Sequence, residues 1–166
     1  MPLAEHQAEI DAILAKYPAD RQRAAVMPLL HLAQREYGYL STDALREVAG
    51  LLGLETTEVA KLVKFYTLYH AEPGGRFRVQ ICTDLPCALR GAEAFSAELC
   101  QRLGVKPGET TSDGQITVEQ VMCLAACDMA PMFQVQGADG IHYCENQTVD
   151  SALEHIEGLR QETVDG

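Results

Sequence analysis

The sequence predicts an α/β protein in two parts, a helical N-terminal domain in residues 1–73 and an α/β domain in residues 75–166. Three observations lead to this fold class. Apolar residues recur at helical spacing throughout the first part. The segment Ala-Glu-Pro-Gly-Gly at residues 71–75 is rich in turn-forming residues. Beyond it, apolar and polar residues alternate as in a strand. The chain has 166 residues, 47% of them hydrophobic, which is enough for two small domains with cores of their own.

Four helices are predicted in the first part. Their expected ranges are residues 3–17, 20–37, 42–52 and 56–69. Pro28 falls inside the second range, where it should kink the helix or lie in its early turns. Ser41 or Thr42 can cap the third helix, and Thr56 or Thr57 can cap the fourth, because short hydroxyl side chains accept hydrogen bonds from free N–H groups of a first turn.

The second part is predicted to alternate between strands and helices. Phe77, Val79 and Ile81 alternate with polar residues, which indicates a strand, and helical spacing returns over residues 90–103. The further expected elements are strands at 116–122, 132–136 and 141–145, a hairpin turn at 137–140, and a helix at 148–160. A β-α-β crossover requires its two strands to be parallel. The order β-α-β-β-β-α is that of a small thioredoxin-like sheet.

Charge and hydropathy restrict the class of partner. The net charge is −11, with 10 acidic against 7 basic residues in residues 1–75 and 14 against 6 in residues 76–166. Such a surface repels phosphate, so we expect no nucleic-acid partner, although residues 45–64 have the spacing of a helix-turn-helix. The longest apolar run, residues 24–33, is too short to span a membrane, and no secretory signal is recognisable. We therefore expect a cytoplasmic protein without direct membrane insertion.

The six cysteines all follow residue 81, and four of them form two pairs. Cys82 and Cys87 are separated by four residues, and Cys123 and Cys127 by three. A disulfide framework is not expected in a cytosolic chain. Each pair directly follows a predicted strand, and parallel strands end at the same edge of a sheet. The four thiolates should therefore converge from two neighbouring loops.

Three kinds of site could use these cysteines. A [2Fe–2S] cluster needs two thiolates at each of two irons, which suits two separated loops and is favoured. Zinc usually takes shorter spacers, and a redox dithiol usually takes two intervening residues, so both are weaker alternatives. Cys100 should be a small buried hydrophobic residue, while the state of Cys144 on the last strand is left open. No nucleophile–base set and no phosphate-binding glycine loop is recognisable, so the chain alone should not catalyse a reaction.

Short motifs along the chain match those of one known family. They are Lys16-Tyr-Pro, Ala24-Ala-Val-Met-Pro-Leu-Leu, Glu58-Val59, Phe65-Tyr66, Cys82-Thr through Cys87, Arg90-Gly91-Ala92-Glu93, Pro107-Gly108-Glu109-Thr110, Cys123-Leu-Ala-Ala-Cys127 and Ala130-Pro131. From about residue 10 to residue 160, the chain resembles the small thioredoxin-like [2Fe–2S] subunit of respiratory complex I, the family of the E subunit of NADH:quinone oxidoreductase.

That resemblance implies a fold, a cofactor and partners. The fold would be an N-terminal helical bundle followed by a thioredoxin-like [2Fe–2S] ferredoxin domain. One [2Fe–2S] cluster would be bound, as metal and cofactor, by Cys82, Cys87, Cys123 and Cys127. The chain would be a non-catalytic electron-transfer subunit in the cytoplasmic peripheral arm of a membrane-associated complex. Its partners would be the subunit that binds NADH and FMN and further peripheral-arm subunits. The alternatives are the equivalent subunit of an NAD-linked formate dehydrogenase or NAD-reducing hydrogenase and, more distantly, a zinc-stabilised interaction module.

The chain also departs from the family pattern at the second cysteine pair. The family commonly has glycine there, where this chain has Ala125, and alanine fits if the backbone does not need a positive φ. Asp84 lies in the first loop and Asp128 follows Cys127. A carboxylate near the cluster would disfavour the addition of an electron, so Asp128→Asn should raise the midpoint potential. Backbone N–H groups of the two loops are the expected hydrogen-bond donors to the sulfurs.

Overall fold

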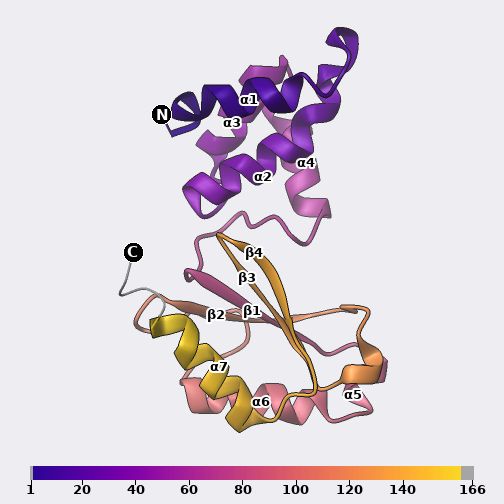
Figure 1. The fold of residues 1–166 in the computed structure, drawn as a ribbon, viewed down its shortest axis with the longest axis vertical. Helices are drawn as coiled ribbons and strands as arrows, with labels where there is room; N and C mark the ends of the chain where they lie inside the picture. The colour runs from indigo at the N-terminus through magenta and orange to yellow at the C-terminus, as the bar shows by residue number, and fades with distance from the viewer. Residues whose placement is uncertain (1, 162–166) are drawn as a thin grey trace. The chain divides into compact units, whose positions relative to one another are not determined.

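The computed structural model describes residues 2–161. The chain divides into two compact units between Pro73 and Gly74. The first unit contains helices α1 to α4, and the second contains a four-stranded sheet with helices α5 to α7 (Figure 1). No helix in this part of the chain combines the length and apolar character that a membrane crossing requires.

The first unit is helical, as predicted. Its elements are the 3-10 segment η1 (Pro2–His6), α1 (Gln7–Leu14), the 3-10 segment η2 (Ala19–Ala25), α2 (Val26–Tyr37), α3 (Thr42–Leu52) and α4 (Thr56–Phe65). The first two predicted helices were too long, because η1 precedes α1 and η2 contains the non-helical residue Arg21 (φ −129°). Pro28 lies in the first turn of α2, where the missing N–H costs no helical hydrogen bond.

The helix ends confirm one predicted cap and correct another. Ser41 accepts a hydrogen bond from the Ala44 N–H (3.2 Å) and caps α3, as expected. The cap of α4 is Glu55 rather than Thr56 or Thr57, so that prediction was wrong. The Glu58 carboxylate reaches back to the Glu55 N–H (3.4 Å) and forms a capping box. The fourth helix also ends at Phe65, earlier than predicted.

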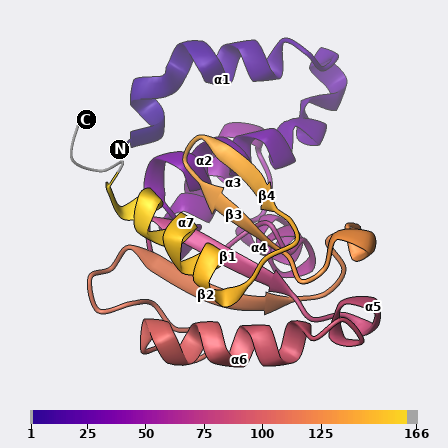
Figure 2. The same cartoon turned by 60° about the horizontal axis from the view of Figure 1, so that its bottom comes forward.

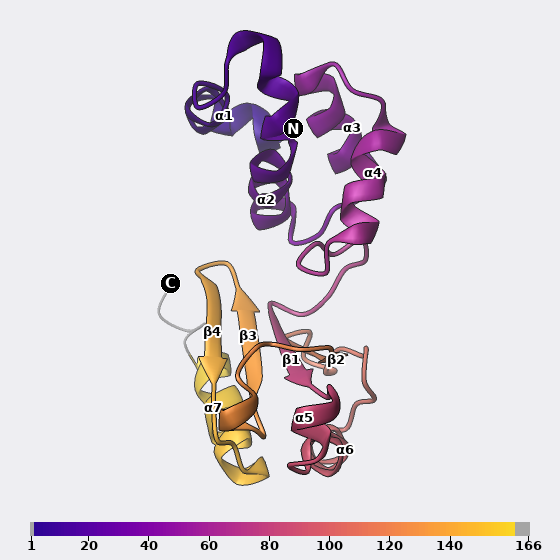
Figure 3. The ribbon, with the colours of Figure 1, turned by 90° about the vertical axis from the view of Figure 1, so that its right-hand side faces the viewer.

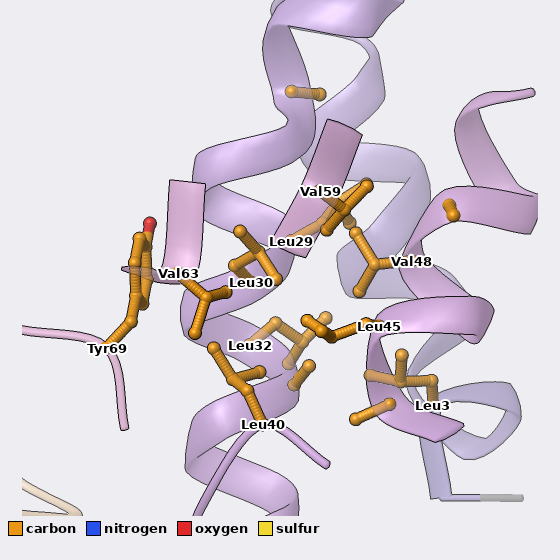
Figure 4. Packing of buried hydrophobic residues seen from close by; sticks show 14 of the residues in the cluster. Leu3, Leu29, Leu30, Leu32, Leu40, Leu45, Val48, Val59, Val63 and Tyr69 are labelled. Atoms are coloured by element: carbon orange, nitrogen blue, oxygen red, sulfur yellow. The ribbon is translucent and has the colours of Figure 1, made fainter. Parts of the chain in front are cut away.

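Aliphatic side chains of α2, α3 and α4 form the core of the first unit. Figure 4 shows Leu29 and Leu30 of α2 pointing toward Val48 of α3 and Val59 of α4, and all four are at most 1% exposed. Burying a side chain of this size stabilises the fold by roughly 1.5–3 kcal/mol. The Gln34 side chain of α2 accepts a hydrogen bond from the His70 N–H and donates one to the Leu68 carbonyl. These two bonds connect the segment after α4 to α2.

The second unit has the predicted β-α-β-β-β-α order, with one additional short helix. Its elements are β1 (Phe77–Cys82), α5 (Leu85–Ala88), α6 (Ala92–Leu103), β2 (Ile116–Val121), the 3-10 turn η3 (Cys127–Met129), β3 (Phe133–Gly137), β4 (Gly140–Cys144) and α7 (Val149–Gln161). The strands follow the order β2-β1-β3-β4 (Figure 3). As predicted, β1 and β2 are parallel, while β3 is antiparallel to both β1 and β4. Helix α6 begins two residues later than expected because Gly91 is left-handed (φ +92°).

The two faces of the sheet differ in chemistry. The apolar core includes Val79 and Ile81 of β1 and Val118 of β2, packed with Leu99 of α6 and Ile156 of α7. Helices α6 and α7 therefore cover the same face. On the opposite face, the Gln134 amide donates to Gln80 (2.6 Å), and Gln80 donates to the Glu119 carboxylate (2.8 Å), which also pairs with Arg78. Buried polar groups on this face are thus hydrogen-bonded to one another.

Candidate metal centre

The first cysteine loop is shaped by the end of β1 and the short helix α5. Cys82 is the last residue of β1, and the Thr83 N–H donates to the Val121 carbonyl of β2 (3.0 Å). Asp84 begins α5 as its N-cap, with its carboxylate accepting from the Leu85 N–H (2.9 Å). This single helical turn brings Cys87 back toward Cys82, and both cysteines are buried.

The second loop follows β2 and turns at Ala125. Alanine was expected to replace glycine here without strain only if the backbone did not need a positive φ. Ala125 has φ +61°, so it is strained. In this conformation its N–H points at the Cys123 sulfur (3.4 Å), which places one of the expected backbone donors. Cys127 then begins η3, in which the Met129 N–H donates to the Ala126 carbonyl (3.1 Å).

The two loops lie at the same end of the sheet, as Figure 2 shows for α5 and the segment after β2. Their convergence follows from the parallel register, which pairs Cys82 with Val121. The Arg90 guanidinium also donates to the Ala130 carbonyl (3.1 Å) and so joins the end of the first loop to the second. Cys82, Cys87, Ala130 and neighbouring apolar residues share one buried cluster. The predicted convergence of the two loops is confirmed.

The four sulfurs influence one another electrostatically. Burial raises the pKa of Cys87 to about 12, and its hydrogen bond with Cys82 and the charges of Cys127 and Cys123 contribute further. Burial and the neighbouring Cys123 also raise the pKa of Cys127. The inner pair, Cys82 and Cys87, is buried, whereas Cys123 is exposed and Cys127 half-buried. Metal binding at these thiols would therefore release protons.

The arrangement of the sulfurs fits a binuclear centre. Within each pair one thiol contributes to the raised pKa of the other, and each pair comes from a different loop. Two thiolates for each of two irons is the donor set of a [2Fe–2S] cluster.

Comparison with known proteins identifies the family of the chain. The family model of the thioredoxin-like [2Fe-2S] ferredoxin matches residues 10–160. The chain belongs to this family. Its predicted fold class is thereby confirmed, with a thioredoxin-like [2Fe–2S] ferredoxin domain after the N-terminal helices.

Relatives of this ferredoxin chain include the E subunits of one enzyme, NADH-quinone oxidoreductase. The E subunit numbered 2 of Rhizobium meliloti is 45% identical over 155 residues, 93% of this chain and 90% of the relative. The E subunit of Mycobacterium tuberculosis strain H37Rv is 43% identical over 157 residues, 93% of this chain but 60% of the relative. The resemblance to the E subunit is therefore confirmed.

Solved structures also share the fold. Among them is an air-oxidised NAD+-reducing [NiFe]-hydrogenase with a TM-score of 0.67 and 21% identity, covering 81% of this chain and 23% of that one. At this level of identity the likeness concerns the fold alone.

Two further cysteines of this ferredoxin lie away from the four. Cys100 on α6 is buried in the apolar core of the second unit, as expected. Cys144 on β4 is also buried, and its sulfur lies 3.3 Å from Nε2 of His155. Sequence reasoning gave no role to Arg90, although its position three residues after Cys87 was a usable signal. A basic side chain so close to a ligand loop can reach the neighbouring loop.

Proposed function

We propose that the chain is an electron-transfer subunit of an NADH:quinone oxidoreductase that carries one [2Fe–2S] cluster on Cys82, Cys87, Cys123 and Cys127. The observation that carries this proposal is the convergence of the two cysteine pairs at the ends of parallel strands β1 and β2. The identity to the E subunit of Rhizobium meliloti over nearly the whole chain supports the parent enzyme. The chain alone performs no catalysis in this proposal.

The residues of the site hold the cluster and control access to it. The buried Cys82 and Cys87 would hold it together with Cys123 and Cys127, which are more exposed. When bound, the cluster would supply one-electron chemistry. Exposure of the outer pair shortens the path to a partner, while the Ala125 N–H donates to the Cys123 sulfur and stabilises its negative charge.

The surface around the two loops supports a protein partner. Leu85, Leu89 and Met122 expose 68%, 81% and 71% of their area, and Met129 exposes 36%. Large apolar side chains grouped on a surface favour protein contacts. We assign this surface to the subunit that binds NADH and FMN, whose flavin would supply the electron. Further subunits of a cytoplasmic peripheral arm would complete the assembly, with the N-terminal helices docking on a partner.

A second candidate is the equivalent subunit of an NAD-reducing hydrogenase or NAD-linked formate dehydrogenase. The fold shared with a solved NAD+-reducing hydrogenase favours this candidate. The much higher identity to the E subunit of NADH-quinone oxidoreductase favours the quinone-linked enzyme. Copurification of the tagged chain from its source, followed by identification of the subunits that accompany it, distinguishes the two.

The cluster is tested by anaerobic purification of the full chain, assay of iron and acid-labile sulfide, and EPR of dithionite-reduced protein. We expect about two irons and two sulfides per chain. Serine at Cys82, Cys87, Cys123 or Cys127 should abolish or alter the EPR signal. Alanine at Cys100 or Cys144 should leave it unchanged. Stoichiometric zinc without sulfide would overturn the proposal and favour the zinc-stabilised module.

A further inference from the structure

Asp84 holds a carboxylate at a fixed position inside the first cysteine loop. It follows Cys82 by two residues and precedes Cys87 by three. Its side chain accepts a hydrogen bond from the Leu85 N–H (2.9 Å), and its carbonyl accepts one from the Ala88 N–H (2.8 Å). The residue is half-buried. Rotating the carboxylate away would uncap α5, so its charge is held within the first loop, between Cys82 and Cys87.

Asp128 provides a contrast, although it directly follows Cys127. It is exposed in η3, where water and salt screen its charge. Asp84, in contrast, is half-buried, so water and salt screen its charge less. Arg90 is a basic residue at this end of the sheet, and its Nε–H donates to the Ala130 carbonyl.

We propose that Asp84 tunes the reduction potential of the group held by the four cysteines, keeping it lower than a neutral side chain would. This inference rests on the proposed function. Reduction adds one electron, supplied in the enzyme by the partner's flavin, and breaks no bond to a thiolate. The negative charge of the group and its ligands therefore grows by one. A fixed carboxylate nearby repels that added charge and favours the oxidised form.

Asp84→Asn isolates the charge, because asparagine caps a helix as well as aspartate and has nearly the same size. The experiment uses the full chain with its cluster, in an EPR-monitored redox titration at neutral pH. At the wild-type midpoint potential, we expect the ratio of reduced to oxidised protein to rise about two- to tenfold in Asp84→Asn. For one electron this corresponds to at most about 59 mV. Higher ionic strength should shrink the difference from wild type.

Asp128→Asn is the matched control, since it removes the same charge beside a ligand but at an exposed position. Its effect should be clearly smaller than that of Asp84→Asn. Asp84→Ser, which also preserves a cap, should reproduce the shift, and iron content and far-UV circular dichroism should match wild type.

An unchanged potential in Asp84→Asn and Asp84→Ser, or an equal shift in Asp128→Asn, would overturn the inference. The proposed function fails separately if the wild-type chain shows no [2Fe–2S] signal.

Discussion

From the left-handed backbone at Ala125 we predict a change in folding stability for the variant Ala125→Gly. A non-glycine residue in this conformation costs about 1–2 kcal/mol because its Cβ approaches the carbonyl oxygen, and Ala125 has φ +61°. Ala125→Gly removes that strain. The alanine side chain is exposed, so little packing is lost. Glycine also gains freedom in the unfolded chain, which offsets the benefit by about 0.4–1 kcal/mol. The net expectation is a stabilisation of about 0.5–1 kcal/mol.

Thermal unfolding of the full, anaerobically purified chain, followed by far-UV circular dichroism, measures this difference. The strained residue belongs to the unit after Pro73, which is the size of a small domain. For such a unit a change of about 1 kcal/mol moves the melting temperature by about 4–8 °C. Ala125→Gly should therefore raise the melting temperature of the second unit by about 2–8 °C.

The adjacent residue provides the control. Ala126 has φ −119°, which any residue adopts without strain. Ala126→Gly should lower stability by at least about 0.5–1 kcal/mol, because glycine adds freedom to the unfolded chain and loses the methyl group that packs against the buried cluster of Cys82, Cys87 and Ala130. If Ala125→Gly lowers the melting temperature as Ala126→Gly does, the strain argument is wrong.

Two further predictions concern the loop contacts of the second unit. Arg90→Ala removes the hydrogen bond to the Ala130 carbonyl, so we expect the free energy of unfolding to fall by about 1 kcal/mol. We also expect the variant to release iron to a chelator faster than wild type, which visible absorbance measures. Asp113→Asn should flatten the fall of stability in acid, measured by urea unfolding at neutral and acidic pH. Hydrogen bonds from the Thr111 hydroxyl and the Gln115 N–H lower the pKa of Asp113 below its usual value of about 3.8. The carboxylate thus contributes stability that is fully present above the unfolded-state pKa and is lost as pH falls through the lower folded-state pKa.

Surface residues in the same unit serve as controls for the predictions on Arg90→Ala and Asp113→Asn. Within residues 2–161, the ion pair of Arg102 is a long contact with the exposed Asp150 (3.6 Å), so Arg102→Ala should release iron at the wild-type rate. Asp150→Asn should keep the wild-type acid profile, because its side chain is 88% exposed. Wild-type iron release in Arg90→Ala, or an acid profile of Asp113→Asn as steep as wild type, would contradict the respective prediction.

Local patterns in the sequence were sufficient for most of the secondary structure. The alternation of apolar and polar residues in residues 77–81 and the helical spacing of apolar residues in residues 92–103 involve only residues a few positions apart. Both patterns correctly predicted their elements, the strand β1 and the helix α6. The cap of α4 was not predicted, because Glu58 reaches back to Glu55 and displaces the hydroxyl caps expected nearby. The short helix α5 was missed because four residues are too few to show a period.

The sequence by itself predicted the donor set, since two cysteine pairs after strands of one β-α-β unit should emerge at the same edge of a sheet. Only the tertiary structure decided which pair is buried, because burial depends on residues distant in sequence. The tertiary structure also showed that Asp84 and Asp128 differ in exposure, although both lie close to a cysteine of a pair in the sequence. Screening by water depends on exposure, and exposure is a property of the packed loops. The positive φ of Ala125 and the reach of Arg90 across the loops likewise arise from how the two loops fold against each other.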